Sequence, residues 1–171
     1  MIKNGLIIFS TTIVVMIAVM AFNERETSQS KRFAIVENKA DKRVDILIDG
    51  KPFTSYIYPD GIKKPALYPL RTSDGALVTR GWPLDPRPGE RVDHPHHVGM
   101  WLNYGNVNGL DFWNNSTDIP AEKRDHYGTV KHRSVNKMQA DNDKAVLEVT
   151  ADWQKPDGTN LLREEIGRAH V

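Results

Sequence analysis

The chain has 171 residues, of which 39% are hydrophobic, so it is long enough to form one domain with an apolar core. The 23 Lys and Arg residues outnumber the 22 Asp and Glu residues by one. This balance excludes a strong positive electrostatic field that would attract nucleic acid or an anionic membrane surface. Cysteine is absent, which excludes disulfides, thiolate metal ligands and cysteine nucleophiles.

The first 22 residues have the composition of an export signal. Lys3 precedes an apolar run over residues 5–22 that only Ser and Thr interrupt. Val19 and Ala21 are small residues at the positions that a signal peptidase reads, and they predict cleavage after Ala21. The run is also nearly long enough to remain as a membrane anchor. We therefore expect an exported protein, periplasmic or extracellular, which contacts the membrane only through residues 5–22 if they are not cleaved.

After a polar linker over residues 23–32, apolar residues alternate with polar ones. Residues 44–48 and 53–57 both show this period of two, and Asp49-Gly50 between them tolerates the positive φ angles of a tight turn. The pattern predicts a β-hairpin.

The second half of the chain predicts longer strands. Residues 145–154 place apolar side chains on one face, and a Pro-Asp-Gly turn follows at 156–158. The stretch YGTVKHRSVNKMQAD predicts a preceding strand that ends at an Asp-Asn-Asp turn, and ALVTRG predicts a short strand after the turn at 73–75. No segment after residue 22 shows a sustained helical period. We therefore expect an all-β, antiparallel β-sandwich that follows the N-terminal signal or anchor helix.

The last seven residues, EIGRAHV, resemble the translation of a short sequencing adapter, and we set residues 165–171 aside as an artefact. On this interpretation the real protein continues beyond residue 164. Residues 33–164 would then be the N-terminal part of a truncated sandwich domain.

Three of the six histidines lie within DHPHHVGMW, directly after a loop over residues 81–95 that is rich in proline and glycine. On an extended backbone His94 and His96 point to one side and His97 to the other, so the first two are candidate metal ligands. No glutamate follows them closely, as it would in a cupin-like His-x-His site, so we assign no cofactor and keep a divalent metal as an alternative. The third ligand would have to be Asp93, Asp111, His126 or His132.

Proton transfer is the main chemical alternative. Imidazole has a pKa of about 6.5, close to working pH, so a histidine in a cleft can act as a general acid or base. Asp93 or Asp111 would orient the ring. In a purely structural role, His97 and one neighbour would cap backbone groups where the loop enters a strand. The catalytic candidates are His94, His96, His97 and Asp111.

The segment NVNGLDFWN adds amide, carboxylate and aromatic groups. Amides and carboxylates pair with sugar hydroxyls, and a tryptophan stacks on the apolar face of a pyranose. Core packing of the tryptophans, and a tight turn at Asn108-Gly109, are competing interpretations.

Arginines in the same region offer charge for a ligand. Arg80, at the end of a predicted strand, is a candidate for binding a carboxylate or phosphate, whereas Arg87 fits a solvated loop surface. The candidate ligand-binding residues are Arg80, Trp101, Asn106, Asn108 and Trp113.

Five motifs follow one another along the chain: IDGKPFTSYIYP, KPALYPL, GALVTRGWP, DHPHHVGMW and GNVNGLDFW. Together they resemble a bacterial family that carries the label "methane oxygenase PmoA" and is essentially a domain of unknown function. The resemblance is strongest over residues 44–113 and extends more loosely to residue 164. Val98 stands where the family usually has arginine after the paired histidines, so a role of that arginine in ligand binding does not carry over. Members of the family are longer than this chain and tend to accompany exported sugar-degrading enzymes.

Literal methane oxidation does not fit this chain. A membrane methane monooxygenase subunit has many spanning helices, whereas this chain has one apolar segment. The leading hypothesis is a protein that binds or processes a carbohydrate or other small molecule by His and Asp acid/base chemistry, as a hydrolase or epimerase. The alternatives are a non-catalytic carbohydrate-binding module and a His-ligated, metal-dependent enzyme.

Overall fold

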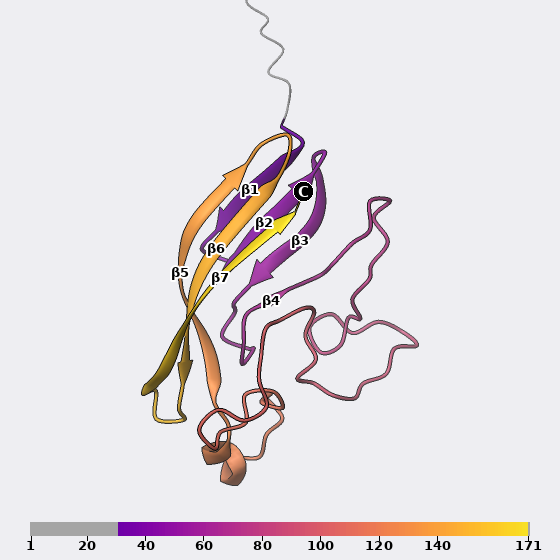
Figure 1. The fold of residues 1–171 in the computed structure, drawn as a ribbon. Coiled ribbons are helices and arrows are strands. Elements are labelled where there is room, and N and C mark those ends of the chain that lie inside the picture. The colour runs from indigo at the N-terminus through magenta and orange to yellow at the C-terminus, as the bar shows by residue number, and fades with distance from the viewer. Residues whose placement is uncertain (1–30, 171) are drawn as a thin grey trace, which may run out of the picture. The chain divides into compact units, whose positions relative to one another are not determined.

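The computed structural model describes residues 31–170, with side chains described to residue 167. The predicted signal or anchor segment therefore lies outside the described residues. Within them, seven strands form two antiparallel sheets, and a single short 3-10 helix is the only helical element. The prediction of an all-β antiparallel sandwich is confirmed (Figure 1).

The first sheet has the strand order β1-β2-β3-β4, and the second has the order β5-β6-β7. The strands of the first sheet are β1 (Phe33–Asn38), β2 (Arg43–Ile48), β3 (Lys51–Ile57) and β4 (Ala66–Leu67). Those of the second are β5 (Thr129–Ala140), β6 (Ala145–Gln154) and β7 (Asn160–His170), and the 3-10 helix η1 (Ala121–His126) precedes them. Among the described residues, no helix has the length and apolar character needed to span a membrane.

The predicted hairpin is confirmed as β2 and β3. Asp49 and Gly50 have φ angles of 51° and 73°, which a two-residue turn of this type requires. Val44 lies opposite Tyr56 in the register, and both side chains are buried. The alternation seen in the sequence therefore marks the face that points into the core.

The predicted strand over residues 145–154 is confirmed as β6, the central strand of the second sheet. Gly158, with a φ of 84°, forms the predicted turn and donates its backbone N–H to the Lys155 carbonyl at 3.0 Å. The last strand, β7, continues through residues 165–170, which the sequence interpretation sets aside as an artefact; that interpretation stays a prediction.

The two sheets pack face to face over one apolar cluster. Its buried members come from both sheets: Phe33, Val44, Ile46, Tyr56, Leu67, Ala145, Leu147 and Val149. Burying a Leu, Val or Phe side chain stabilises a fold by about 1.5–3 kcal/mol. This cluster is the main source of stability for the sandwich.

Between the sheets in sequence, residues 68–120 contain no strand and no helix and form a long irregular excursion (Figure 1). The predicted short strand ALVTRG was wrong. Its backbone forms only an isolated bridge between Arg71 and Leu77, and Leu77 and Val78 are exposed. Because the apolar side chains of this stretch are exposed, no buried face holds it against a sheet.

Phe112 anchors the excursion to the second sheet. Its ring, 1% exposed, lies 4.8 Å from the Trp153 ring, centroid to centroid. It also covers Gly128 so closely that a Cβ there would lie 2.1 Å from the ring. Glycine at 128 therefore makes room for the phenylalanine, and this contact fixes the neighbouring residues Asp111 and Trp113 in place.

Candidate functional site

The three clustered histidines lie on a tight turn. His94 has a φ of 48°, and its carbonyl accepts a hydrogen bond from the His97 N–H at 3.0 Å. The ring centroids of His94 and His97 are 5.1 Å apart, and those of His96 and His97 are 4.3 Å apart. The expectation that His97 points away from the other two was wrong because it assumed an extended backbone. All three rings gather in one cluster.

Arg80 supports this turn through its guanidinium group. Nη1 donates to Asp93 Oδ1 at 2.9 Å, and Nη2 donates to the carbonyls of Asp93 and His94 at 2.6 Å each. The hydrogen bond from Arg80 is the main cause of the lowered pKa of Asp93. The second oxygen of Asp93 lies 3.2 Å from His94 Nδ1 and 3.2 Å from Arg91 Nη2. The contacts give Arg80 a positioning role, and its binding of a ligand stays a prediction.

Gly99 and Met100 attach the histidine turn to the first sheet. Met100 and Leu67 of β4 exchange two backbone hydrogen bonds of 2.8 and 3.0 Å. Gly99 has a φ of 59°, and a Cβ there would lie 2.3 Å from the Leu67 carbonyl oxygen. Only glycine allows the turn to approach the strand this closely.

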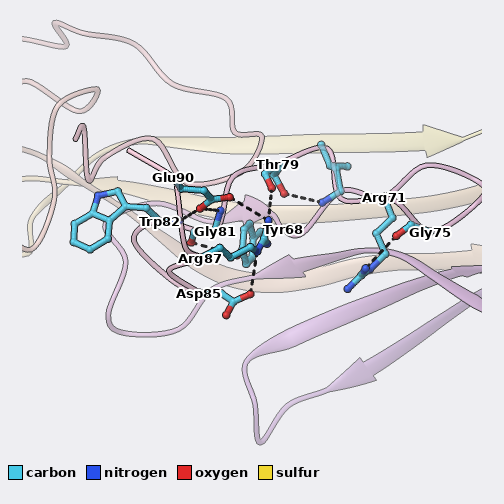
Figure 2. A network of polar contacts seen from close by, with 10 residues as sticks. Tyr68, Arg71, Gly75, Thr79, Gly81, Trp82, Asp85, Arg87 and Glu90 are labelled. Atoms are coloured by element: carbon cyan, nitrogen blue, oxygen red, sulfur yellow. Dashed lines mark hydrogen bonds and ion pairs between the residues drawn. The ribbon is translucent and has the colours of Figure 1, made fainter. Parts of the chain in front are cut away.

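A polar network stabilises the loop that leads to the histidines (Figure 2). Glu90 accepts the Gly81 N–H at 2.7 Å, and Arg87 contacts Glu90 at 3.3 Å and the Thr79 carbonyl at 3.2 Å. The Arg87 side chain is only 25% exposed, so its prediction as a solvated surface residue was wrong. Figure 2 shows the Trp82 indole directed away from this network. The loop is therefore held by specific polar contacts despite its lack of regular structure.

Lys64 is a site residue that the sequence analysis missed. It is 3% exposed, and its ammonium group donates to the Phe112 carbonyl at 3.2 Å and to the Trp113 carbonyl. The ammonium also lies 5.3 Å from the centre of the Trp101 ring. Burial lowers the pKa of Lys64 to about 8, and the Asp111 carboxylate opposes that shift. No local pattern marks this lysine, since its partners lie far along the chain.

Lys64 and His96 both line a hollow of about 110 Å³, here called the His96 hollow. Its lining residues are Gly61, Ile62, Lys63, Lys64, Pro83, Leu84, Pro95, His96, Val98, Asn115, Ser116 and Thr117. Burial, followed by the charges of His97 and Lys64, lowers the pKa of His96 to about 4. His96 is therefore a neutral imidazole at neutral pH, able both to donate and to accept a hydrogen bond. His94, in contrast, is exposed.

Two tryptophans stand beside the histidine cluster. The His97 ring lies 5.7 Å from Trp101 and 6.2 Å from Trp113, and the two indoles are 5.5 Å apart. Trp113 is 41% exposed, and neither tryptophan belongs to the apolar clusters of the core. Within the described residues, the buried indole N–H of Trp101 has no hydrogen-bond partner. Of the neighbouring pair at 112 and 113, Phe112 is the core residue.

The remaining predicted site residues lie on nearby turns. Asp111 accepts hydrogen bonds from the Asn114 backbone N–H at 2.9 Å and from Asn114 Nδ2 at 2.7 Å. Asn106 accepts the Gly109 N–H at 2.9 Å, and Asn108 has a φ of 53°, so both asparagines build a turn. Within residues 31–167, no hydrogen bond joins either asparagine to the histidine turn. Their ligand-binding role stays a prediction.

The histidines weighed as further metal ligands lie elsewhere. His126 is exposed on η1, and His132 lies on β5 with Nδ1 3.1 Å from the Tyr56 hydroxyl. In the part of the chain that the structure describes, no group of three or more His, Asp or Glu side chains has the arrangement of a metal site.

A second hollow, of about 200 Å³ and here called the Tyr58 hollow, adjoins the first through Ile62 and Lys64, which line both. The His132 ring stacks on Tyr58 at 3.9 Å between centroids, and burial lowers the pKa of His132. The hollow is lined by Lys42, Tyr58, Pro59, Asp60, Ile62, Lys64, Pro65, Val130, Lys131 and His132. The sequence analysis missed this site because its walls come from three separate parts of the chain.

Together, the fold and these hollows define a β-sandwich protein whose polar candidate site is built by a long irregular excursion. The chain belongs to a family of unknown function, DUF6807, whose family model matches residues 43–168. No curated protein and no solved structure shows a significant match to the chain.

Proposed function

We propose that the protein binds a saccharide at the His96 hollow and the adjacent tryptophans. The observation that carries the proposal is the position of Trp101 and Trp113. Both stand outside the core clusters, and Trp113 is 41% exposed beside the histidine cluster. An accessible indole next to a polar hollow is typical of sites that stack on a pyranose and pair with its hydroxyls.

The lining of the His96 hollow supplies the polar complement for such a ligand. It combines a neutral imidazole at His96 with the buried side chains of Asn115 and Ser116 and with the Thr117 hydroxyl. Asn115 Nδ2 already donates to the Gly128 carbonyl and the Thr129 hydroxyl, so Asn115 offers a ligand only its amide oxygen, whereas His96 and the two hydroxyls can both donate and accept. Val98, 5% exposed, adds an apolar wall to the same hollow.

Acid/base catalysis on the bound saccharide is a second candidate function. It is favoured by the presence of His96 and Lys64, both with lowered pKa values, in one hollow. Lys64, whose pKa of about 8 is close to working pH, would take up or release the proton in hydrolysis or epimerisation, and the neutral His96 would hydrogen-bond the reacting hydroxyl. Asp111, whose charge acts on both groups, remains the candidate carboxylate.

Export and a relationship to the PmoA-labelled family are part of this proposal. The apolar segment over residues 5–22 supports export to the periplasm or the cell exterior. The motifs around the histidines and Trp113 support the relationship. The association of that family with sugar-degrading enzymes agrees with a saccharide ligand.

Saccharide binding is tested by titrating the full-length chain with neutral oligosaccharides and following tryptophan fluorescence. We expect a saturable change that Trp113→Ala reduces at least tenfold in affinity. Met138→Ala is the matched control, since Met138 on β5 is a large apolar residue of similar exposure, 44%. Equal loss in both variants, or no saturable change with any saccharide, would refute the proposal.

The His96→Ala variant separates catalysis from recognition. If the protein is an enzyme, this variant loses turnover and keeps most of its affinity for the saccharide. If the site only binds, affinity falls and no turnover is found with the unmodified chain either.

A further inference from the structure

Positive charge is concentrated around the two adjoining hollows. Their linings contain four lysines, Lys42, Lys63, Lys64 and Lys131, and a single carboxylate, Asp60. The formal charge of this region is therefore +3, whereas the whole chain carries +1. The carboxylates of Glu37 and Asp111, which lie outside the linings, act on lining residues and reduce this excess, but the lysines still outnumber the carboxylates.

The lysines differ in how they are neutralised. Lys42 pairs with Asp60, which is itself 83% exposed. Within residues 31–167 the structure gives no ion-pair partner for Lys63 or Lys131. Lys64 donates to the neutral carbonyls of Phe112 and Trp113 and lies over the Trp101 ring, and the described residues give it no ion pair. Three of the four lysines in the linings therefore have no ion pair within the described residues, although the charge of Lys131 acts on Asp60.

The segment over residues 61–65 lies between the hollows and connects them. Ile62 and Lys64 line both, and the Lys63 carbonyl accepts the Val130 N–H of β5 at 2.9 Å. This bond fixes Lys63 and Lys64 beside Lys131, the next residue of β5. A ligand that passes over this segment would meet ammonium groups from two directions.

We propose that the two hollows together bind an acidic saccharide, with a sugar ring on Trp113 that places a hydroxyl in the His96 hollow, and with a carboxylate or sulfate group at the lysines of the Tyr58 hollow. This inference rests on the proposed saccharide site and names its ligand class. Lys64, held rigidly between the hollows, provides the charge common to both. Lys63 and Lys131 pair with acidic groups at either side of it.

The stacked rings of Tyr58 and His132 contribute the second wall. Their centroids are 3.9 Å apart, and the His132 ring is held through its Nδ1 contact with the Tyr56 hydroxyl at 3.1 Å. This fixed aromatic pair lies beside Lys131 in the lining of the Tyr58 hollow. An aromatic surface next to a cation suits an acidic sugar better than an isolated anion, because it also contacts the sugar ring.

Calorimetry on the full-length chain, at low and physiological salt, compares three oligosaccharides of equal length with inorganic sulfate. The oligosaccharides are an oligogalacturonate, a sulfated oligosaccharide and a neutral galacto-oligosaccharide. We expect at least one acidic oligosaccharide to bind about tenfold more tightly than the neutral one, with an advantage that shrinks as salt increases. The preferred probe identifies the acidic group as carboxylate or sulfate.

Charge variants locate the effect. Lys63→Gln and Lys131→Gln should each weaken binding of the acidic probe about twofold to fivefold and leave the neutral probe unchanged. Asp60→Asn should strengthen binding of the acidic probe, because it releases Lys42. Lys51→Gln is the control, since Lys51 is an exposed lysine beside the β2–β3 turn and outside both hollows.

The outcomes distinguish a wrong ligand class from a wrong binding site. Equal binding of acidic and neutral oligosaccharides would overturn the acidic ligand and leave the saccharide site intact. Binding of inorganic sulfate as tight as that of the sulfated oligosaccharide, or an equal loss in Lys51→Gln, would overturn it as well. If no saccharide binds, both proposals fail.

Discussion

The two sheets and the excursion over residues 68–120 are stabilised in different ways. The sheets meet over an apolar cluster with members such as Leu147 and Val149, each 2% exposed. The deepest apolar anchor of the excursion is Phe112, 1% exposed, and polar side chains that bind backbone carbonyls, above all Lys64 and Arg80, hold the rest. The contrast indicates that the site can be loosened without unfolding the sandwich that carries it.

The largest expected effect comes from removing the anchor. Phe112→Ala should lower the free energy of unfolding by about 3–5 kcal/mol, because it leaves a cavity against Trp153 and Gly128. Hydrogen exchange should accelerate first in residues 103–117. The matched change in the sheets, Leu147→Ala, should accelerate exchange in β2 and β6 instead. Identical exchange patterns in the two variants would contradict the division into two regions.

The next effect concerns pH and Lys64. The folded chain releases the Lys64 proton near pH 8, whereas the unfolded chain keeps it to its ordinary pKa of 10.5. Between these values the unfolded state binds more protons, so the free energy of unfolding rises with pH, by on the order of 3 kcal/mol from this group. Denaturant unfolding at several pH values should show this rise in the unmodified chain and not in Lys64→Met. Parallel pH profiles would show that Lys64 is not buried as described.

A smaller effect is expected at Arg80. Arg80→Ala removes three hydrogen bonds to Asp93 and His94 and should cost about 1–3 kcal/mol. The resonances of the three clustered histidines should broaden or shift together, since the turn loses its support. Arg80→Lys should restore only part of the stability, because an ammonium cannot form the same fork of bonds. Unchanged histidine resonances in Arg80→Ala would refute this positioning role.

The smallest effect lies inside the sandwich. The Thr54 hydroxyl on β3 is buried and has no hydrogen-bond partner within the described residues. Thr54→Val keeps the shape of the side chain and removes the unpaired hydroxyl, so it should stabilise the fold by about 1 kcal/mol. A lower melting temperature in this variant would show that the Thr54 hydroxyl does form a stabilising hydrogen bond in the folded chain.

The same contrast explains what the sequence could predict. The hairpin of β2 and β3, and the strand β6, follow from alternation and from turn residues such as Asp49-Gly50, which are local signals. The histidine cluster was found from composition, but its geometry was not, because the positive φ of His94 breaks the extended backbone that the alternation argument assumed. Lys64 depends on carbonyls 48 and 49 residues away, which no local pattern reveals.

Nuclear magnetic resonance of His96 shows whether the excursion forms a ligand-accessible hollow around this residue. In the full-length chain we expect the imidazole of His96 to stay neutral until the pH falls to its pKa of about 4. An added oligosaccharide should shift the resonances of His96 and of the Trp113 indole and leave those of His126, exposed on η1, unchanged. A pKa near 6.5 for His96, together with no response of either residue to any saccharide, would contradict the account.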